Sequence, residues 1–416
     1  MPSRLGTVAA LLVGSGSQSL ANAVAALLAT RLLAVETRGI MVVCVTLAAI
    51  VGLVMSLGTG TALRSLRPQS TAADLDGLLS AYAWCSLASL PCASATAAAA
   101  YVLMSVVSPS LEAGWTPALA ASAAAFPIVM NTQLTEAWFA AGHYRRGSWL
   151  ASAAAMLGLG LMLCAAFVQA TLLSLIVAQA LGGTLVGVAS AVWATRAGCL
   201  RWRRPHVEAV APLLRRGAGS LGMPIGLAVI TRSDRLILAA VVSPSAAAVY
   251  ALASTLSEGL RLIPSAIAQI VTHDVANGLG APAVARRQKQ SLITLSLISG
   301  PLVGVAFLLI EPVFGSEYAA AAGLLAILVL AELGFAVFWI ALRGLVGGGW
   351  SAALSILGTA TACVAVPTYW LAATNWSGLG CAVATVIIYV LAGAAGNWIL
   401  RRYLARRPIV QVSQAQ

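Results

Sequence analysis

The stretch RAGCLRWRRPHVEAVAPLLRRG, from Arg196 to Gly217, is the longest connection between apolar runs in this chain, and it carries six arginines. The apolar runs on both sides of it are each long enough to cross a hydrocarbon core of about 30 Å as a helix. We interpret the stretch as a topogenic loop that is partly an amphipathic interfacial helix, with Trp202 at the lipid headgroups. It would then link two membrane-embedded halves.

The composition of the whole chain indicates a membrane protein. Its 416 residues have a mean hydropathy of +0.93, and 9% of them are charged, whereas about a quarter are charged in a soluble domain. We therefore predict an all-α polytopic membrane protein with about twelve transmembrane helices, in two six-helix bundles around a central cavity. The predicted spans are 7–30, 39–62, 78–106, 114–140, 148–168, 171–195, 218–242, 246–272, 290–310, 318–345, 351–372 and 378–401.

The domain organisation follows from the position of the basic stretch. We expect an N-terminal six-helix bundle at 1–195, a basic cytoplasmic linker at 196–217, a C-terminal six-helix bundle at 218–404 and a cytoplasmic tail at 405–416. Six spans per half make both halves begin on the same side of the membrane. This is the arrangement of parallel-repeat transporters, whose halves are related by an axis along the membrane normal.

The distribution of basic residues predicts the orientation. With a cytoplasmic N-terminus, nineteen of the 24 lysines and arginines fall in cytoplasmic segments, two in external ones and three inside spans. Such an asymmetry is typical of the positive-inside rule and places both termini in the cytoplasm. The net charge of +12 therefore reflects topology. The expected partner is the lipid bilayer, and nucleic acid is not expected.

Motifs of enzymes and metal sites are missing from the sequence. It contains no Walker P-loop, GxSxG or HExxH motif, and its seven cysteines form no CxxC pair. The external connections are too short to form a soluble domain. We therefore expect no catalytic residues, no metal and no cofactor.

Charged residues inside the spans are the strongest functional signal, because such charges usually face a bundle interior or an aqueous cavity. Arg232, Asp234 and Arg235 lie in the seventh span, and Glu258 and Arg261 in the eighth. At about 1.5 Å of rise per residue, the two groups lie within a turn or two of one membrane level. Two packed helices would bring them into one mixed-charge cluster.

Two interpretations of this cluster are open. Asp234 and Glu258 each pair with an arginine and lock the two spans together, or three arginines against two acids leave a positive charge for a ligand. Guanidinium groups bind phosphate in a bidentate manner, which favours an anionic substrate for Arg232, Arg235 and Arg261. The further candidates are Arg31 and Arg38, as basic lining or as external headgroup contacts, and Glu332, for proton or ion coupling.

Two segments resemble a known family. ATRLLAVETRGIMVVCVTLAAIVGLVMSLGTGTALRS, residues 29–65, resembles the first two spans of bacterial polysaccharide-biosynthesis flippases. RSDRLILAAVVSPSAAAVYALASTLSEGLRLIPSAIAQIV, residues 232–271, resembles their seventh and eighth spans, with an Asp-Arg pair followed by Tyr250 and Ala251. The chain has Ala34 and Ser243 where that family often has glycine.

The resemblance implies membership of the multidrug, oligosaccharidyl-lipid and polysaccharide exporter superfamily. It implies a flippase for an undecaprenyl-diphosphate-linked oligosaccharide or polysaccharide precursor, working by alternating access. The arginines would hold the anionic headgroup of this lipid-linked glycan, and a glycan polymerase or glycosyltransferase would be a partner. The alternatives are an ion-coupled drug exporter of the same superfamily, a membrane-embedded enzyme of cell-envelope assembly, and a scaffold that binds the lipid-linked precursor without moving it.

Overall fold

The computed structural model describes residues 4–204 and 207–406, and throughout them the regular secondary structure is helical. The ends of the predicted first bundle and tail, 1–3 and 407–416, lie outside the described residues. The helices of the first half are α1 (Arg4–Leu32), α2 (Val35–Met55), α3 (Thr59–Leu66), η1 (Arg67–Gln69), α4 (Ala72–Val107), α5 (Trp115–Ala140), α6 (Tyr144–Val168) and α7 (Leu172–Arg196). The remaining helices are α8 (Val207–Ser220), α9 (Gly222–Val241), α10 (Pro244–Glu258), η2 (Gly259–Arg261), α11 (Leu262–Ala276), α12 (Ala281–Phe314), η3 (Ser316–Tyr318), α13 (Ala320–Gly347) and α14 (Ser351–Arg406).

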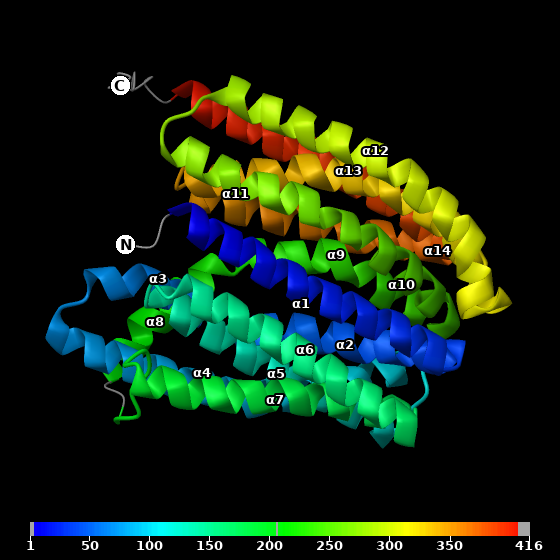
Figure 1. Ribbon diagram of the computed structural model, residues 1–416, viewed down its shortest axis with the longest axis horizontal. Coiled ribbons are helices and arrows are strands. Elements are labelled where there is room, and N and C mark those ends of the chain that lie inside the picture. The colour runs from blue at the N-terminus through cyan, green and yellow to red at the C-terminus, as the bar shows by residue number, and fades with distance from the viewer. Residues whose placement is uncertain (1–3, 205–206, 407–416) are drawn as a thin grey trace.

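The helices form two layers (Figure 1), with α9–α14 in one, α2–α8 in the other and α1 between them. The first half is built on contacts among α2, α4, α5, α6 and α7, and the second on contacts among α9, α11, α12, α13 and α14. The halves meet where α2 packs against α9 and α10. We call the end at which α1 begins and α14 ends the terminal end, and the opposite one the distal end. This arrangement confirms the predicted all-helical polytopic fold of two bundles.

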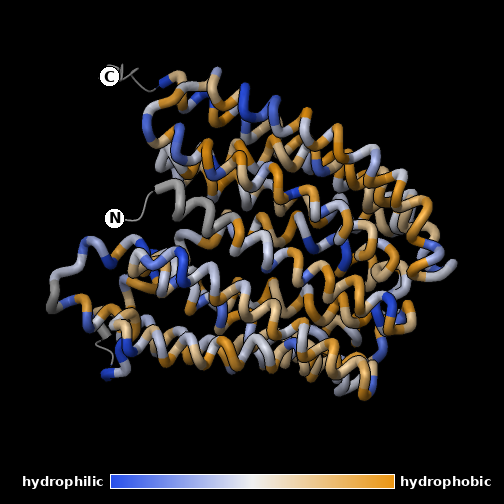
Figure 2. Tube along the Cα trace, viewed as in Figure 1, coloured by the Kyte–Doolittle hydropathy of each residue, from blue (hydrophilic) through white to orange (hydrophobic). Residues whose placement is uncertain are grey.

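The long helices carry the hydrophobic character that a membrane requires. Seven helical segments of the described chain are long and apolar enough to cross a membrane: Val35–Gln69, Asp74–Val107, Tyr144–Val168, Leu172–Arg196, Ala281–Phe314, Ser316–Gly347 and Ser351–Arg406. The other predicted crossings, α1, α5, α9 and α10–α11, contain polar residues that line the cavity described below. Figure 2 shows hydrophobic rods with hydrophilic segments mainly at their ends.

Side-chain caps fix several helix starts. Thr171 and Ser174 form a capping box at the start of α7, which satisfies backbone N–H groups that have no partner within the helix. Ser243 accepts a hydrogen bond from the backbone N–H of Ala246 at 3.1 Å, and Pro244 follows it at the first helical position. Serine before proline is a strong start signal. The sequence Ser243-Pro244 therefore begins α10 without a glycine.

Two predicted spans are interrupted in the structure, and two others are joined. The span at 39–62 is divided because Leu57 and Gly58 adopt left-handed backbone angles, with φ of 49° and 62°. The span at 246–272 contains the 3₁₀ turn η2. The last two spans form one helical segment, α14, broken only at Ser377, where φ is 52° and ψ is −138°. Tyr369 and Thr385 form a hydrogen bond across that break, so the two arms of α14 fold back on each other.

The basic stretch packs on the first half of the molecule. Helix α8 contacts α3 and α4, and Leu213 on it is completely buried. The indole N–H of Trp202 donates to Thr195 at 2.9 Å, and its ring meets the edge of Trp84. The stretch is thus a docked element with the predicted helix inside it, and Trp202 has protein partners.

Candidate functional site

A cavity of about 830 Å³ lies between the two halves, within the range of roughly 300–1,000 Å³ that ligand sites occupy. Helices α1, α2, α5, α6 and α7 line it from the first half, and α9, α10, η2 and α11 line it from the second. This is the central cavity that the predicted fold requires.

Contacts between the halves close the molecule at the distal end. The hydroxyl of Ser108 donates to the carbonyl of Ala240 at 2.6 Å, and that of Ser110 donates to the carbonyl of Ala239 at 2.9 Å. Both carbonyls belong to the last turn of α9, where helix carbonyls have no partner within the helix. Gly39 on α2 lies so close to Pro244 on α10 that a Cβ atom would be 1.8 Å from the proline carbonyl oxygen. We call these contacts the distal seal.

Arg235 and Glu258 form an ion pair between α9 and α10 at the cavity wall. The Arg235 residue is 9% exposed, and its Nε atom has no hydrogen-bond partner among the described residues. Glu258 also lies 3.6 Å from Nη1 of Arg261. The structure therefore brings Arg235, Glu258 and Arg261 into one cluster.

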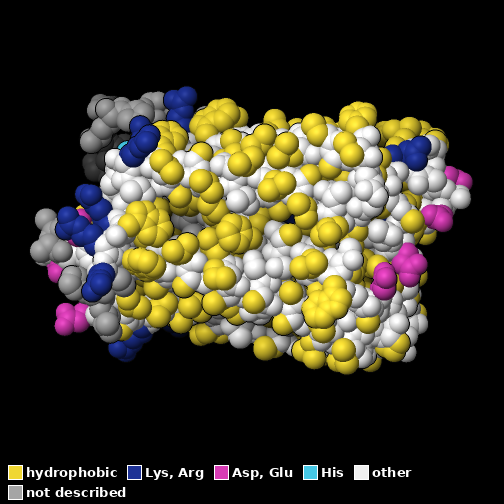
Figure 3. Space-filling model, turned by 90° about the horizontal axis from the view of Figure 1, so that it is seen from below, with side chains coloured by type: hydrophobic (Ala, Val, Ile, Leu, Met, Phe, Trp, Pro, Cys, Tyr) yellow, Lys and Arg dark blue, Asp and Glu magenta, His cyan; other side chains and the backbone are white. Residues whose placement is uncertain are grey.

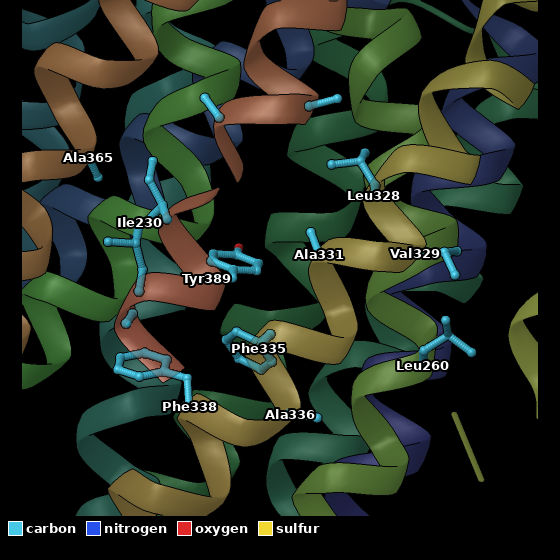
Figure 4. Close-up of a cluster of buried hydrophobic side chains, with 14 of the residues drawn as sticks. Ile230, Leu260, Leu328, Val329, Ala331, Phe335, Ala336, Phe338, Ala365 and Tyr389 are labelled. Atoms are coloured by element: carbon cyan, nitrogen blue, oxygen red, sulfur yellow. The ribbon is translucent and has the colours of Figure 1, made fainter. Parts of the chain in front are cut away.

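Residues of α13 and α14 hold the guanidinium group of Arg261 in place. Its Nε and Nη2 atoms each donate to the carboxylate of Glu332 at 2.8 Å, and Nη2 reaches the Tyr389 hydroxyl at 3.2 Å. The guanidinium carbon lies 4.4 Å from the centre of the Phe335 ring. Figure 4 shows Phe335 and Tyr389 facing each other within the buried hydrophobic cluster. Glu332 is 3% exposed and acts here as the ion-pair partner of Arg261.

The Asp234 carboxylate is hydrogen-bonded by groups other than the arginine side chains. Its carboxylate accepts hydrogen bonds from the Tyr250 hydroxyl and from the backbone N–H of Arg235, both at 2.8 Å. The Tyr250 hydroxyl lies 3.0 Å from Thr385, which also bonds Tyr369. Asp234 is 3% exposed and is not part of the cavity wall. The interpretation in which it pairs with an arginine side chain is therefore wrong, since its partner is a tyrosine.

The other predicted arginines have different surroundings. Arg232 lines the cavity, and no described residue forms a hydrogen bond or an ion pair with its guanidinium. Arg38 also lines it, and its Nε donates to Thr30 at 3.0 Å. Arg31 is exposed at the end of α1 and is absent from the cavity wall. Of the two roles expected for Arg31, its position fits an external headgroup contact better than cavity lining.

Several residues of the site carry weak signals in the sequence. Tyr389, Phe335 and Thr385 occur within apolar runs, and only their contacts show that they hold Arg261 and the Asp234 network. Gln179 on α7 lines the cavity. The signal for this role in the sequence is an amide side chain inside a predicted transmembrane span. Glu136 lines the cavity and forms an ion pair with Arg64 at 2.5 Å.

Comparisons with known proteins identify the fold. No protein-family model and no curated protein matches the sequence. Among solved structures, the lipid II flippase MurJ in an inward closed conformation aligns with a TM-score of 0.71 and 12% identity, over 96% of this chain and 88% of that one. The chain has the fold of a membrane transporter. An inward-facing multidrug resistance MATE family transporter of the MOP superfamily aligns at 0.67 and 16% identity over 93% and 94%. The eukaryotic MATE transporter AtDTX14 aligns at 0.66 and 15% identity over 96% of each chain.

Proposed function

We propose that this protein is a flippase of the bacterial cytoplasmic membrane. It moves an undecaprenyl-diphosphate-linked oligosaccharide or polysaccharide precursor by alternating access. The observation that carries the proposal is the guanidinium of Arg232, which faces the cavity without a partner among the described residues. Beside it, Nε of Arg235 is a buried donor that is also unpaired. The Arg235 guanidinium itself pairs with Glu258, so Arg232 is the cationic donor at this cavity wall that is best suited to a phosphate group.

The orientation of the proposed flippase follows from surface charge. Figure 3 shows basic side chains gathered mainly at the terminal end, acidic ones prominent at the distal end, and hydrophobic side chains between. By the positive-inside rule the terminal end is cytoplasmic. Because the distal seal closes the other end, the cavity is placed to receive its substrate from the cytoplasmic leaflet. Glycosyltransferases that supply the lipid-linked glycan, or a polymerase that consumes it, would be its partners.

The experiment that tests this function is glycan export in a flippase-deficient bacterial cell complemented with the protein. Wild type should restore export, whereas Arg232→Ala should reduce it by about 10- to 100-fold, the equivalent of one lost charged hydrogen-bonding group. Arg31→Ala is the matched control, because Arg31 is exposed and absent from the cavity wall. Full export by a well-inserted Arg232→Ala variant would contradict a role for Arg232 in binding the substrate.

Ion-coupled export of small cationic molecules is a second candidate. The observation that favours it is Glu136, a carboxylate in the cavity wall, together with the MATE transporters among the structural neighbours. Glu136 is already paired with Arg64, which leaves it less available to a cation. Drug resistance without restored glycan export in the same cells would support this candidate and contradict the flippase.

A further inference from the structure

The two walls of the central cavity differ in chemistry. The wall from the second half carries Arg232, Arg235, Glu258 and Arg261. The wall from the first half is rich in uncharged amide side chains, which come from three different helices: Gln18 and Asn22 on α1, Asn131 on α5 and Gln179 on α7. The first-half wall also carries Arg38 and Glu136, but the amides of the cavity lie on this wall only, and we call these four amide residues the amide face.

The amides of the first half are free to bind a ligand. Within the described chain, the side chains of Gln18, Asn22 and Gln179 form no hydrogen bond. Asn131 donates its N–H groups to the carbonyls of Pro127 at 2.9 Å and Gly183 at 3.0 Å, so its orientation is fixed and its carbonyl oxygen remains as an acceptor.

The depth of these amides makes their lack of partners informative. From about 1.5 Å of rise per residue, they lie roughly 10 to 24 Å from the distal ends of their helices, which is inside the membrane. An unsatisfied polar group is costly there, so such groups normally line a pathway filled by water or by a polar ligand.

The chemistry of an amide selects among ligands. An amide both donates and accepts hydrogen bonds and has no charge, which matches the hydroxyl groups of a sugar. A phosphate is better served by the arginines on the opposite wall. A cation is better served by a carboxylate, and Glu136, on the amide wall, is paired with Arg64.

We propose that the amide face, Gln18, Asn22, Asn131 and Gln179, is a subsite for uncharged, hydroxyl-rich sugar units, which face it while the diphosphate lies at the arginines. This inference rests on the proposed function and extends it to the class of glycan. The described residues of the cavity wall include no aromatic ring, so recognition of the sugars is by hydrogen bonds and not by stacking.

Equilibrium binding to the full-length protein in lipid nanodiscs tests the inference. The two probes are undecaprenyl diphosphate and undecaprenyl diphosphate that carries a disaccharide of neutral hexoses. Wild type should bind the sugar-bearing probe at least about tenfold more tightly, as several added hydrogen bonds would give. Gln18→Leu/Gln179→Leu should remove most of that advantage and leave the affinity for undecaprenyl diphosphate within about twofold. Gln169→Leu, at an exposed amide just after α6, is the matched control.

The outcomes separate the two proposals. If wild type binds both probes with equal affinity, or if the double variant keeps the full sugar advantage, the amide face is not a sugar subsite, although the flippase proposal stands. Equal weakening of both probes by the double variant also contradicts the subsite. If wild type binds neither probe, the proposed function fails, and this inference fails with it. Retained affinity for undecaprenyl diphosphate shows that the variant is folded.

Discussion

At the scale of single residues, the site depends on pairs that lie far apart in the sequence. Arg261 and Glu332 are 71 positions apart, and Tyr250 and Thr385 are 135 apart. Hydropathy and helical spacing predicted which charges lie at one level on spans seven and eight, because those charges are close in sequence. They did not predict the partners from α13 and α14, since a single sequence does not say which face of an apolar helix meets which neighbour.

The first prediction concerns the buried pair of Arg261 and Glu332. Glu332→Leu should lower the free energy of unfolding by about 1–3 kcal/mol, because it leaves the partly buried guanidinium of Arg261 without its main hydrogen-bond acceptors. Arg261→Leu/Glu332→Leu should recover much of that loss, since replacement of both charges by apolar groups is often close to neutral. Denaturation of the purified protein in detergent measures both. If the double variant is less stable than Glu332→Leu, this account of the pair is contradicted.

At the scale of elements, the long apolar runs were enough to predict the helical rods, but not the breaks within them. Leu57 lies in an apolar run, and nothing in its residue type predicts a left-handed backbone. The break at Ser377 is so short that α14 continues through what was predicted as a loop. Hydropathy measures how hydrophobic a segment is. The breaks at Leu57 and Ser377 depend instead on how neighbouring helices pack against each other.

The second prediction concerns the hydroxyl bonds of the distal seal. Ser108→Ala/Ser110→Ala should shift the population toward a distally open state by roughly 5- to 150-fold, as expected for the loss of two hydrogen bonds of about 0.5–1.5 kcal/mol each. Distances between spin labels on the distal ends of α4 and α9 report the shift. Ser105→Ala is the control, because Ser105 bonds only the carbonyl of Val102 in its own helix. An unchanged distance distribution would mean that other contacts hold the seal.

The third prediction concerns the glycine of the seal. Gly39→Ala should separate α2 from α10, because its Cβ would meet the Pro244 carbonyl oxygen at 1.8 Å. The same labels should then report an open distal end, even when both serines are intact. Gly304→Ala is the matched control in α12, where an added Cβ meets no atom within 4 Å. A closed distal end in Gly39→Ala would contradict the close approach of α2 and α10.

At the scale of the whole molecule, charge predicts how the protein sits in the membrane. Both chain ends and the stretch from 196 to 217 should be cytoplasmic, because their arginines cluster at the terminal end. Cysteines introduced at Gln290 and at Glu317 measure directly which end of the molecule faces the cytoplasm. A membrane-impermeant thiol reagent added to intact cells should label Glu317→Cys in η3 and leave Gln290→Cys in α12 unlabelled, with native cysteines removed. The reverse pattern would invert the proposed direction of transport.

The distal seal has a consequence for the coupling between the distal contacts and the cavity. Ser108 and Ser110 hold the last carbonyls of α9, and the same helix carries Arg232 and Arg235 at the cavity wall. One helix therefore belongs both to these distal contacts, which act as a latch, and to the proposed anion site. Thermodynamic linkage makes such coupling reciprocal: by whatever factor a bound phosphate eases the opening of the latch, an open latch must tighten the grip on that phosphate. In the proposed flippase, this tighter binding in the open state would oppose release of the substrate.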